Sequence, residues 1–262
     1  MPLVSLKNVT KIYANGVTAL QSLTRDFEAG SFTVVIGPSG AGKSTLLRTI
    51  NGLETPSAGE VHVDGQPVTH RDLRSIRAKI GMVFQEFNLV DRLNVMTNVL
   101  AGRLAHRHWS WSLGYLFSKS DYEMAHQALD RVGLVDKAWS RADQLSGGQR
   151  QRVGIARAIC QQPRLILADE PVASLDPGSA VEVMDLLAGI CREDGIAVVA
   201  NLHQLDLTKR YADRVIALRA GRVIYDGKVI NMDDATFKEI YESNKDTHGK
   251  RHEHTDLVLA HA

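Results

Sequence analysis

This sequence of 262 residues has few cysteines, almost no net charge and no long apolar run. Its two cysteines, Cys160 and Cys191, lie in segments of helical pattern without metal-ligand spacing. This argues against a disulfide framework and indicates a reducing compartment. The formal net charge of +1 gives no overall attraction to nucleic acid or to an acidic membrane surface. We therefore expect a chain without a nucleic-acid partner.

The longest apolar runs, such as residues 196–200, have the length of a strand, whereas a membrane-spanning helix needs roughly 18 or more apolar residues. Residues 1–10 lack the basic and apolar regions of a secretory signal. With 44% apolar and 23% charged residues, the composition is that of an ordinary globular protein. These features predict a cytoplasmic protein that acts at a membrane only through a partner.

The order of apolar patterns along the chain predicts an α/β core. Apolar runs of strand length occur at residues 32–36, 79–84, 165–168 and 196–200. Helical patterns separate them, so we expect a mostly parallel sheet with right-handed crossovers. Residues 4–13 alternate apolar and polar side chains instead, which is typical of a strand in an antiparallel sheet. A last hairpin is expected at residues 215–225.

Strand patterns stop near residue 92, and a helical subdomain inserted in the core is predicted from there to about residue 160. Aromatic residues gather within it around Gly114, at Trp109, Trp111, Tyr115 and Phe117. This aromatic group is either an apolar cluster that holds the subdomain together or a surface that meets a membrane partner.

The last part of the sequence, residues 245–262, is polar and rich in histidine. Its spacing matches no ordered metal site, so a disordered tail is favoured over metal binding. We expect one domain over residues 1–244, followed by this tail.

Residues 37–44, G-P-S-G-A-G-K-S, lie between a predicted strand and a predicted helix, which is the context that a phosphate-binding loop requires. The glycines let backbone N–H groups turn inward around phosphate oxygens, and the helix that follows presents its positive end. Lys43 is expected to reach the β- and γ-phosphates, and the Ser44 hydroxyl to bind Mg²⁺. The residues predicted to hold the nucleotide here are Gly37, Ser39, Gly40, Ala41, Gly42, Lys43, Ser44 and Thr45.

The apolar strand predicted at residues 165–168 ends in two adjacent carboxylates, Asp169 and Glu170. An acid at the end of a buried strand beside a phosphate loop suits Mg²⁺ coordination. Asp169 is expected to hold the metal directly or through water. Glu170, on the opposite side of the strand, is expected to polarise the attacking water. Taken alone the pair could be an ordinary polar strand end, but the phosphate loop favours the catalytic interpretation.

Residues 145–149, L-S-G-G-Q, follow the phosphate loop in the same chain, and this pairing resembles the ATPase subunit of ATP-binding-cassette (ABC) systems. The resemblance covers residues 4 to about 226. It implies a P-loop NTPase core with a mostly parallel sheet, an N-terminal antiparallel β subdomain and an inserted α-helical subdomain. It also implies ATP hydrolysis, with ATP and Mg²⁺ as cofactors and a second copy of the chain as partner.

Within this resemblance, the signature of residues 145–149 serves the ATP held by the other subunit. Ser146 and Gly148 are the residues implied to contact its γ-phosphate, with Gly147 and Gln149 completing the nucleotide-binding set. Physically, Ser146 can cap a helix from Gln149 to Cys160 and expose N–H groups to an anion.

Other positions take implied roles from the same resemblance. Tyr13 stacks on adenine, and Asp176 supports the dimer interface. Gln85 touches the metal or the water and faces the transport partner. His203 holds the γ-phosphate and positions the water. Taken singly, such a tyrosine, glutamine or histidine is more often an ordinary packing or surface residue.

A finer resemblance lies in residues 84–104, F-Q-E-F-N-L-V-D-R-L-N-V-M-T-N-V-L-A-G-R-L, and in residues 168–177 and 202–204. These segments resemble the ATPase subunits of phosphonate importers, a group that includes phosphite and phosphonate-ester uptake systems. The implied partners are integral membrane permease subunits and, indirectly, an external substrate-binding protein. The implied location is the cytoplasmic face of the inner membrane.

Two alternatives stay open at this stage. The chain could serve an importer for another solute, such as polar amino acids, or a soluble complex that degrades phosphonates. A cassette acting on nucleic acid or ribosomes usually has two cassettes or long coiled-coil insertions, which this sequence lacks.

Overall fold

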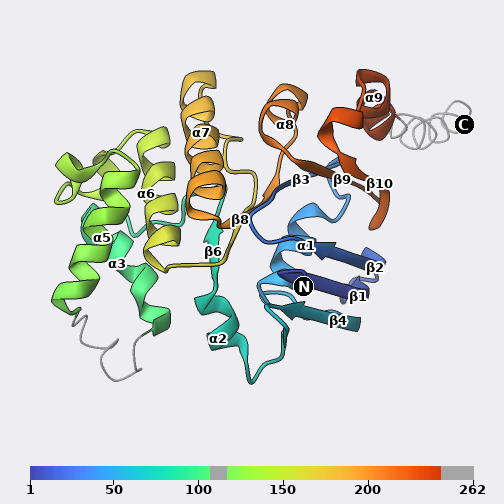
Figure 1. Cartoon of the computed structure of the whole chain (residues 1–262), viewed down its shortest axis with the longest axis horizontal. Helices are drawn as coiled ribbons and strands as arrows, with labels where there is room; N and C mark the ends of the chain where they lie inside the picture. The colour runs from blue at the N-terminus through green and yellow to red at the C-terminus, as the bar shows by residue number, and fades with distance from the viewer. Residues whose placement is uncertain (107–116, 243–262) are drawn as a thin grey trace, which may run out of the picture.

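The computed structural model describes residues 1–106 and 117–242, and within them the strands form a larger and a smaller sheet (Figure 1). The larger has the order β10-β9-β3-β8-β7-β6. Its strands are β3 (Phe32–Ile36), β6 (Ile80–Val83), β7 (Leu165–Ala168), β8 (Ala197–Asn201), β9 (Arg214–Arg219) and β10 (Arg222–Lys228). All neighbouring pairs are parallel except the hairpin of β9 and β10. The predicted α/β class with a mostly parallel sheet is confirmed.

The smaller sheet is antiparallel, with the order β2-β1-β4-β5. It consists of β1 (Val4–Ile12), β2 (Thr18–Phe27), β4 (Ala58–Val63) and β5 (Gln66–Pro67). Helix α1 (Lys43–Ile50) packs between the two sheets through Leu46, Leu47 and Ile50, which are fully buried. The predicted antiparallel β subdomain is therefore confirmed, although β2 was not expected from the sequence.

Side chains of the larger sheet alternate between two apolar cores. On β7, Leu165 and Leu167 face the core shared with α1 and the smaller sheet, whereas Ile166 faces the core on the other side. That second core is covered by helices α7 (Pro177–Asp194), α8 (Leu205–Tyr211) and α9 (Asp234–Glu242), in the upper part of Figure 1. Burial on both faces explains why these strands appear in the sequence as continuous apolar runs.

A helical region lies beside the edge strand β6, at the left of Figure 1. It comprises α3 (Val95–Leu100), η1 (Ala101–His106), α5 (Lys119–Arg131), η2 (Val135–Lys137), η3 (Ala142–Gln144) and α6 (Gly147–Cys160). Short helix α2 (Leu73–Ala78) precedes β6, and η4 (Val229–Asn231) follows β10. None of the helices in the described ranges is long and apolar enough to cross a bilayer.

Of the predicted aromatic group, Trp109, Trp111 and Tyr115 lie outside the described residues, as does the predicted tail at 245–262. Phe117 is described and packs against the core of the helical region, with its ring edge-on to Tyr122 at 6.5 Å between centroids.

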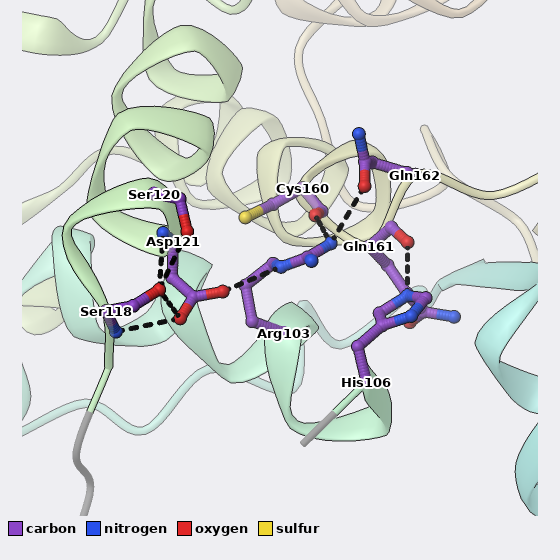
Figure 2. Close-up of polar contacts among 8 residues, drawn as sticks. All are labelled: Arg103, His106, Ser118, Ser120, Asp121, Cys160, Gln161 and Gln162. Atoms are coloured by element: carbon purple, nitrogen blue, oxygen red, sulfur yellow. Dashed lines mark hydrogen bonds and ion pairs between the residues drawn. The ribbon is translucent and has the colours of Figure 1, made fainter.

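A buried ion pair joins two elements of the helical region (Figure 2). Arg103 of η1 donates from Nε to Asp121 Oδ1 of α5 at 3.1 Å, and the two side chains are only 9% and 5% exposed. The Arg103 Nη1 group also donates to the carbonyl of Cys160 at 3.1 Å and to Gln162 Oε1 at 3.2 Å. The pair therefore fastens η1 and the start of α5 to the C-terminal end of α6.

Candidate functional site

Neighbouring parallel strands bring the predicted site residues to one edge of the larger sheet. The strand order places β3, β8, β7 and β6 side by side, and Ala168 is in register with both Val83 and Ala200. The segments that follow these strands contain the phosphate loop, His203, Asp169 and Gln85 in that order. The carboxyl edge of a parallel sheet, where such segments meet, is the usual place for a ligand.

The phosphate loop, residues 37–44, can be built only with glycine at two of its turns. Gly37 and Gly42 have φ values of 144° and 104°. A Cβ atom on Gly37 would overlap the carbonyl oxygen of Leu218, and one on Gly42 the carbonyl oxygen of Ala19. The loop is thus pressed against β9 on one side and β2 on the other, which fixes its path before α1 begins.

Lys43 turns its ammonium group back into this loop. Its Nζ donates to the carbonyl of Gly37 at 2.8 Å and to that of Pro38 at 3.2 Å. Burial lowers the pKa of Lys43, and the negative charges of Glu170 and Asp169 oppose that shift. The loop therefore holds a buried cation close to both carboxylates.

Asp169 is held by donors from helix α1 and strand β8. Its Oδ1 accepts from the Ser44 hydroxyl at 2.7 Å and from Asn201 Nδ2 at 2.7 Å. Its Oδ2 lies 3.9 Å from a guanidinium nitrogen of Arg48. Asn201 was not predicted from the sequence as a site residue. The only local signal is an amide side chain directly after the apolar residues of β8.

Glu170 stands in the left-handed region of the backbone, with φ of 52°. Left-handed backbone at a residue other than glycine is uncommon, and such strain concentrates at functional sites. Its Oε1 lies 2.7 Å from His203 Nε2. The prediction placed Glu170 on the side of the strand opposite Asp169, but β7 ends at Ala168, so neither carboxylate lies in the strand and strand alternation does not set their directions.

The phosphate loop and Glu170 border a pocket of about 300 Å³, whereas Asp169 and His203 lie outside its lining. Its lining consists of Tyr13, Val17, Ala19, Ser39, Gly40, Ala41, Gly42, Lys43, Ser44, Thr45 and Glu170. The Tyr13 hydroxyl and Thr45 Oγ1 are 3.1 Å apart, and Lys11 Nζ lies 5.1 Å from the centre of the Tyr13 ring. A flat ring, a cation-lined loop and a carboxylate thus share one hollow, which suits a base attached to a polyphosphate.

A larger hollow of about 570 Å³ lies over β2 and β10, lined by residues such as Gln21, Arg25 and Arg222. No residue of the phosphate loop and neither carboxylate lines it. The smaller pocket is the candidate site because the chemically active groups converge there.

The signature of residues 145–149 lies elsewhere. Ser146 caps α6, accepting from the Gln149 N–H at 3.3 Å, while Gln149 Oε1 accepts from the Ser146 N–H at 3.0 Å. The helix begins at Gly147, two residues before the predicted start. A Cβ atom on Gly148 would lie 2.8 Å from the hydroxyl of Ser179, so the start of α6 abuts the start of α7. The signature contributes no residue to the pocket.

Asp176 and Gln85 also line no part of the pocket. Asp176 caps α7 by accepting from the Ser179 N–H at 3.0 Å, and the hydrogen bonds from Ser179 lower the pKa of this carboxyl. Gln85 is exposed, two residues beyond the end of β6. Gly37 lies behind the lining, at the end of β3.

The segment after Gln85 is tied to α6 by residues that the sequence did not suggest. Phe87 and Asn88 both have left-handed backbone, with φ of 59° and 49°. Arg157 of α6 donates to the carbonyls of both, and Gln151 Nε2 donates to the carbonyl of Phe84 at 3.3 Å. Three side-chain contacts to carbonyls therefore connect the helix of the signature to the edge of the sheet.

The donors at the pocket fit Mg²⁺ rather than a metal held by protein alone. Among the described residues, no group of three or more His, Cys, Asp and Glu side chains could hold a metal ion. The Ser44 hydroxyl and the Asp169 carboxylate are instead in direct contact beside the loop. Mg²⁺ is usually bound by one or two protein oxygens together with phosphate oxygens.

Comparison with known proteins identifies relatives of this chain. The sequence matches the family described as ABC transporter over residues 20–173. A phosphonates import ATP-binding protein PhnC of Thiobacillus denitrificans is 59% identical, over 92% of this chain and 93% of the relative. A second, from Trichodesmium erythraeum, is 53% identical over 92% of this chain and 94% of the relative.

Solved structures give the same fold. The dimeric post-hydrolysis state of the ATP-binding cassette MJ0796, bound to ADP and Pi, is 36% identical with a TM-score of 0.76 and covers 86% of this chain and 98% of that one. The ADP conformation of the cassette MJ1267 is 27% identical with a TM-score of 0.80, covering 92% and 98%.

Proposed function

This chain belongs to the ABC transporter family and is an ATPase, and on that premise we propose that it powers the import of phosphonates or related phosphorus oxyanions. The observation that carries the nucleotide site is the meeting of the phosphate loop with Asp169 and Glu170. Binding of ATP follows from the family. The roles of individual residues are the proposal's own.

The triphosphate lies along the phosphate loop. Backbone N–H groups of residues 39–45 and the positive end of α1 hold its oxygens, and Lys43 moves from its carbonyl partners to the β- and γ-phosphates. Tyr13, at the other end of the pocket, stacks on adenine. The Ser44 hydroxyl and Asp169 would hold Mg²⁺, and the ion would supply positive charge against the negative charge that develops on the phosphate oxygens.

Hydrolysis uses the carboxylate that lies beside the loop. Glu170 takes a proton from the water as its oxygen attacks the γ-phosphorus, and the bond to the β-phosphate oxygen breaks to leave ADP and phosphate. His203 orients Glu170 through the 2.7 Å contact and also faces the γ-phosphate. Gln85 is exposed and precedes the segment that Arg157 connects to α6. In this position Gln85 transmits the presence or absence of the γ-phosphate in the pocket to α6.

Two chains complete each other's sites. Because the signature lines no part of its own pocket, Ser146 and Gly148 act on the ATP of a second copy in a head-to-tail dimer. Asp176 lies nearby at the start of α7 and supports the same interface. The dimeric cassettes among the structural relatives support this arrangement.

The dimer works at the cytoplasmic face of the inner membrane, bound to separate permease subunits that receive cargo from an external binding protein. The cargo assignment is supported by the relatives, whose names specify phosphonate import and which match more than nine-tenths of this chain. Cargo selectivity itself belongs to the permease and the binding protein.

Replacing Glu170 by glutamine tests the hydrolytic assignment. Loss of the base should lower the ATPase rate by about 10²- to 10⁴-fold while ATP still binds. Lys43→Ala should instead weaken nucleotide binding itself, as measured by titration with a fluorescent ATP analogue. Glu182→Gln, an exposed carboxylate on α7, is the matched control and should change neither quantity. A Glu170→Gln protein with the full ATPase rate would exclude Glu170 as the base.

Uptake of labelled phosphonate by cells that lack this chain tests the cargo. Uptake and growth on phosphonate as sole phosphorus source should both fail, growth on inorganic phosphate should persist, and the Lys43→Ala chain should not restore uptake. Normal phosphonate uptake with lost degradation would favour a soluble degrading complex. Normal phosphonate uptake with lost amino-acid uptake would favour a different importer.

A further inference from the structure

Asn201 is the one amide in the buried strand β8, and it ends that strand between the two strands that carry the nucleotide chemistry. Its residue is in register with Val35 of β3, which leads into the phosphate loop. On the other side, Ala200 is in register with Ala168 of β7, one residue before Asp169. The position therefore lies between the phosphate loop and the metal-binding carboxylate proposed above.

The amide nitrogen of Asn201 fixes one oxygen of that carboxylate. Its Nδ2 and the Ser44 hydroxyl both donate to Asp169 Oδ1, each at 2.7 Å. With Oδ1 held twice, the carboxylate cannot rotate without losing a buried hydrogen bond. Oδ2 is thereby set to one direction, and an oriented carboxylate is what a metal with strict octahedral demands requires.

The other end of the same amide lacks a donor. Asn201 is fully buried, and no donor among the described residues reaches its Oδ1. A buried acceptor left unsatisfied is costly, so buried acceptors of this kind usually serve a ligand or an ordered water. Mg²⁺ keeps several of its waters when it binds to a protein, and each of them is a hydrogen-bond donor.

We propose that Asn201 is a positioning residue for Mg²⁺: its Nδ2 orients Asp169, and its Oδ1 accepts a hydrogen bond from a water that the metal carries. The inference rests on the proposed nucleotide site. It adds an outer layer to that site, contributed by β8, which supplies no other polar side chain to Asp169. Residues in such an outer layer commonly change metal affinity by about 10- to 100-fold.

Asn201→Val tests the assignment, because valine suits a buried strand and removes both polar atoms. The measurement is the affinity for a fluorescent ATP analogue as a function of Mg²⁺ concentration and again in EDTA. The Mg²⁺ concentration for half-maximal enhancement should rise about 10-fold or more, while the affinity in EDTA should change by less than about twofold. Binding of Mn²⁺ with ADP, followed by electron paramagnetic resonance, should weaken in parallel.

Thr33→Val is the matched control. Thr33 is also a buried polar residue, but it lies near the start of β3, at the end away from the phosphate loop, so this variant should behave as wild type. Equal losses with Mg²⁺ and in EDTA would show a general structural role for Asn201, and an unchanged Mg²⁺ requirement would show no role; either result overturns the inference. If the wild-type chain itself bound nucleotide without responding to Mg²⁺, the proposed site would fail instead. Should the valine variant not fold, Asn201→Ala provides the same measurement.

Discussion

The edge of the larger sheet and the helical region beside β6 are held together in different ways. At the sheet edge, the strands that precede the phosphate loop, Asn201 and Asp169 are joined by continuous backbone hydrogen bonds. The helical region is joined to that edge by apolar packing of α6 against β6 and by side chains that donate to carbonyls, chiefly from Arg157 and Gln151.

The difference indicates which part of the molecule is the more rigid. Moving one strand against another would break a whole ladder of bonds, so the groups around the pocket keep their positions. Moving α6 as a unit would instead break a few side-chain hydrogen bonds and shift apolar contacts, without breaking a backbone ladder. A packed helix that shifts as a unit is a common basis for coupling between distant sites. The sheet edge is therefore suited to chemistry, and the helical region to transmission.

The largest expected effect on stability comes from a change inside the helical region, and it tests whether that region and the sheet edge are independent. Arg103→Met leaves the Asp121 carboxylate buried without its guanidinium, and should lower the free energy of unfolding by about 3–5 kcal/mol. Urea titration followed by circular dichroism measures this. Nucleotide affinity of the folded protein should stay within about twofold of wild type.

The double variant Arg103→Met/Asp121→Leu serves as its control, because removing both charges should recover part of the lost stability. A loss of nucleotide affinity as large as the loss of stability would contradict the independence of the two regions.

A smaller change should separate transmission from chemistry. Arg157→Met removes the donors to Phe87 and Asn88, a loss of about 1.5–3 kcal/mol for hydrogen bonds from a charged group. We expect the isolated chain to bind ATP normally, but its ATPase rate to respond less to the permease in reconstituted vesicles.

Arg150→Met is the matched variant, since Arg150 is on the same helix and donates to the carbonyl of Ala142 within the helical region. Equal effects of the two substitutions on the permease response would mean that the bridge to the sheet edge has no special part in coupling.

The smallest expected change in stability comes from the cap of α6. Ser146→Ala should lower the free energy of unfolding by about 1 kcal/mol. The ATPase rate should fall further than that loss explains, because in the dimer proposed above the same hydroxyl contacts the partner's γ-phosphate. Gln149→Ala opens the other half of the capping box, and stability and ATPase rate of both variants should be measured side by side. If both variants lost stability and activity in the same proportion, Ser146 would act only as the N-cap of α6 and would have no separate role in hydrolysis.

The sequence predicted the parts of the fold that depend on neighbouring residues along the chain. Continuous apolar runs marked the strands of the larger sheet because burial on both faces leaves no polar positions. The phosphate loop was predictable from its glycines, because backbone contacts with β9 and β2 leave no room for a side chain at Gly37 and Gly42. The ends of elements were less certain, as the start of α6 illustrates.

What the sequence could not predict depends on contacts between distant residues. The strand β2 has mixed composition and acquires its role only by pairing with β1. Asn201 meets Asp169 because two strands separated by a long helix lie side by side. The left-handed backbone of Glu170 has no local signal, since glycine or asparagine would normally mark it. The sequence pattern extended the strand through Glu170 for that reason, whereas β7 ends at Ala168.

The place of the signature determines how the rate depends on protein concentration. In the dimer proposed above, one chain holds the halves of two different composite sites, since Ser146 and Gly148 lie apart from the pocket of Lys43 and Glu170. In dilute solution, where two chains must first meet, we expect the hydrolysis rate to rise with the square of the chain concentration. In the proposed membrane complex, a permease that holds two chains side by side would remove this dependence. Hydrolysis then becomes first order in the membrane complex, and the number of permeases in the cell, not the number of free chains, sets how much ATP is consumed.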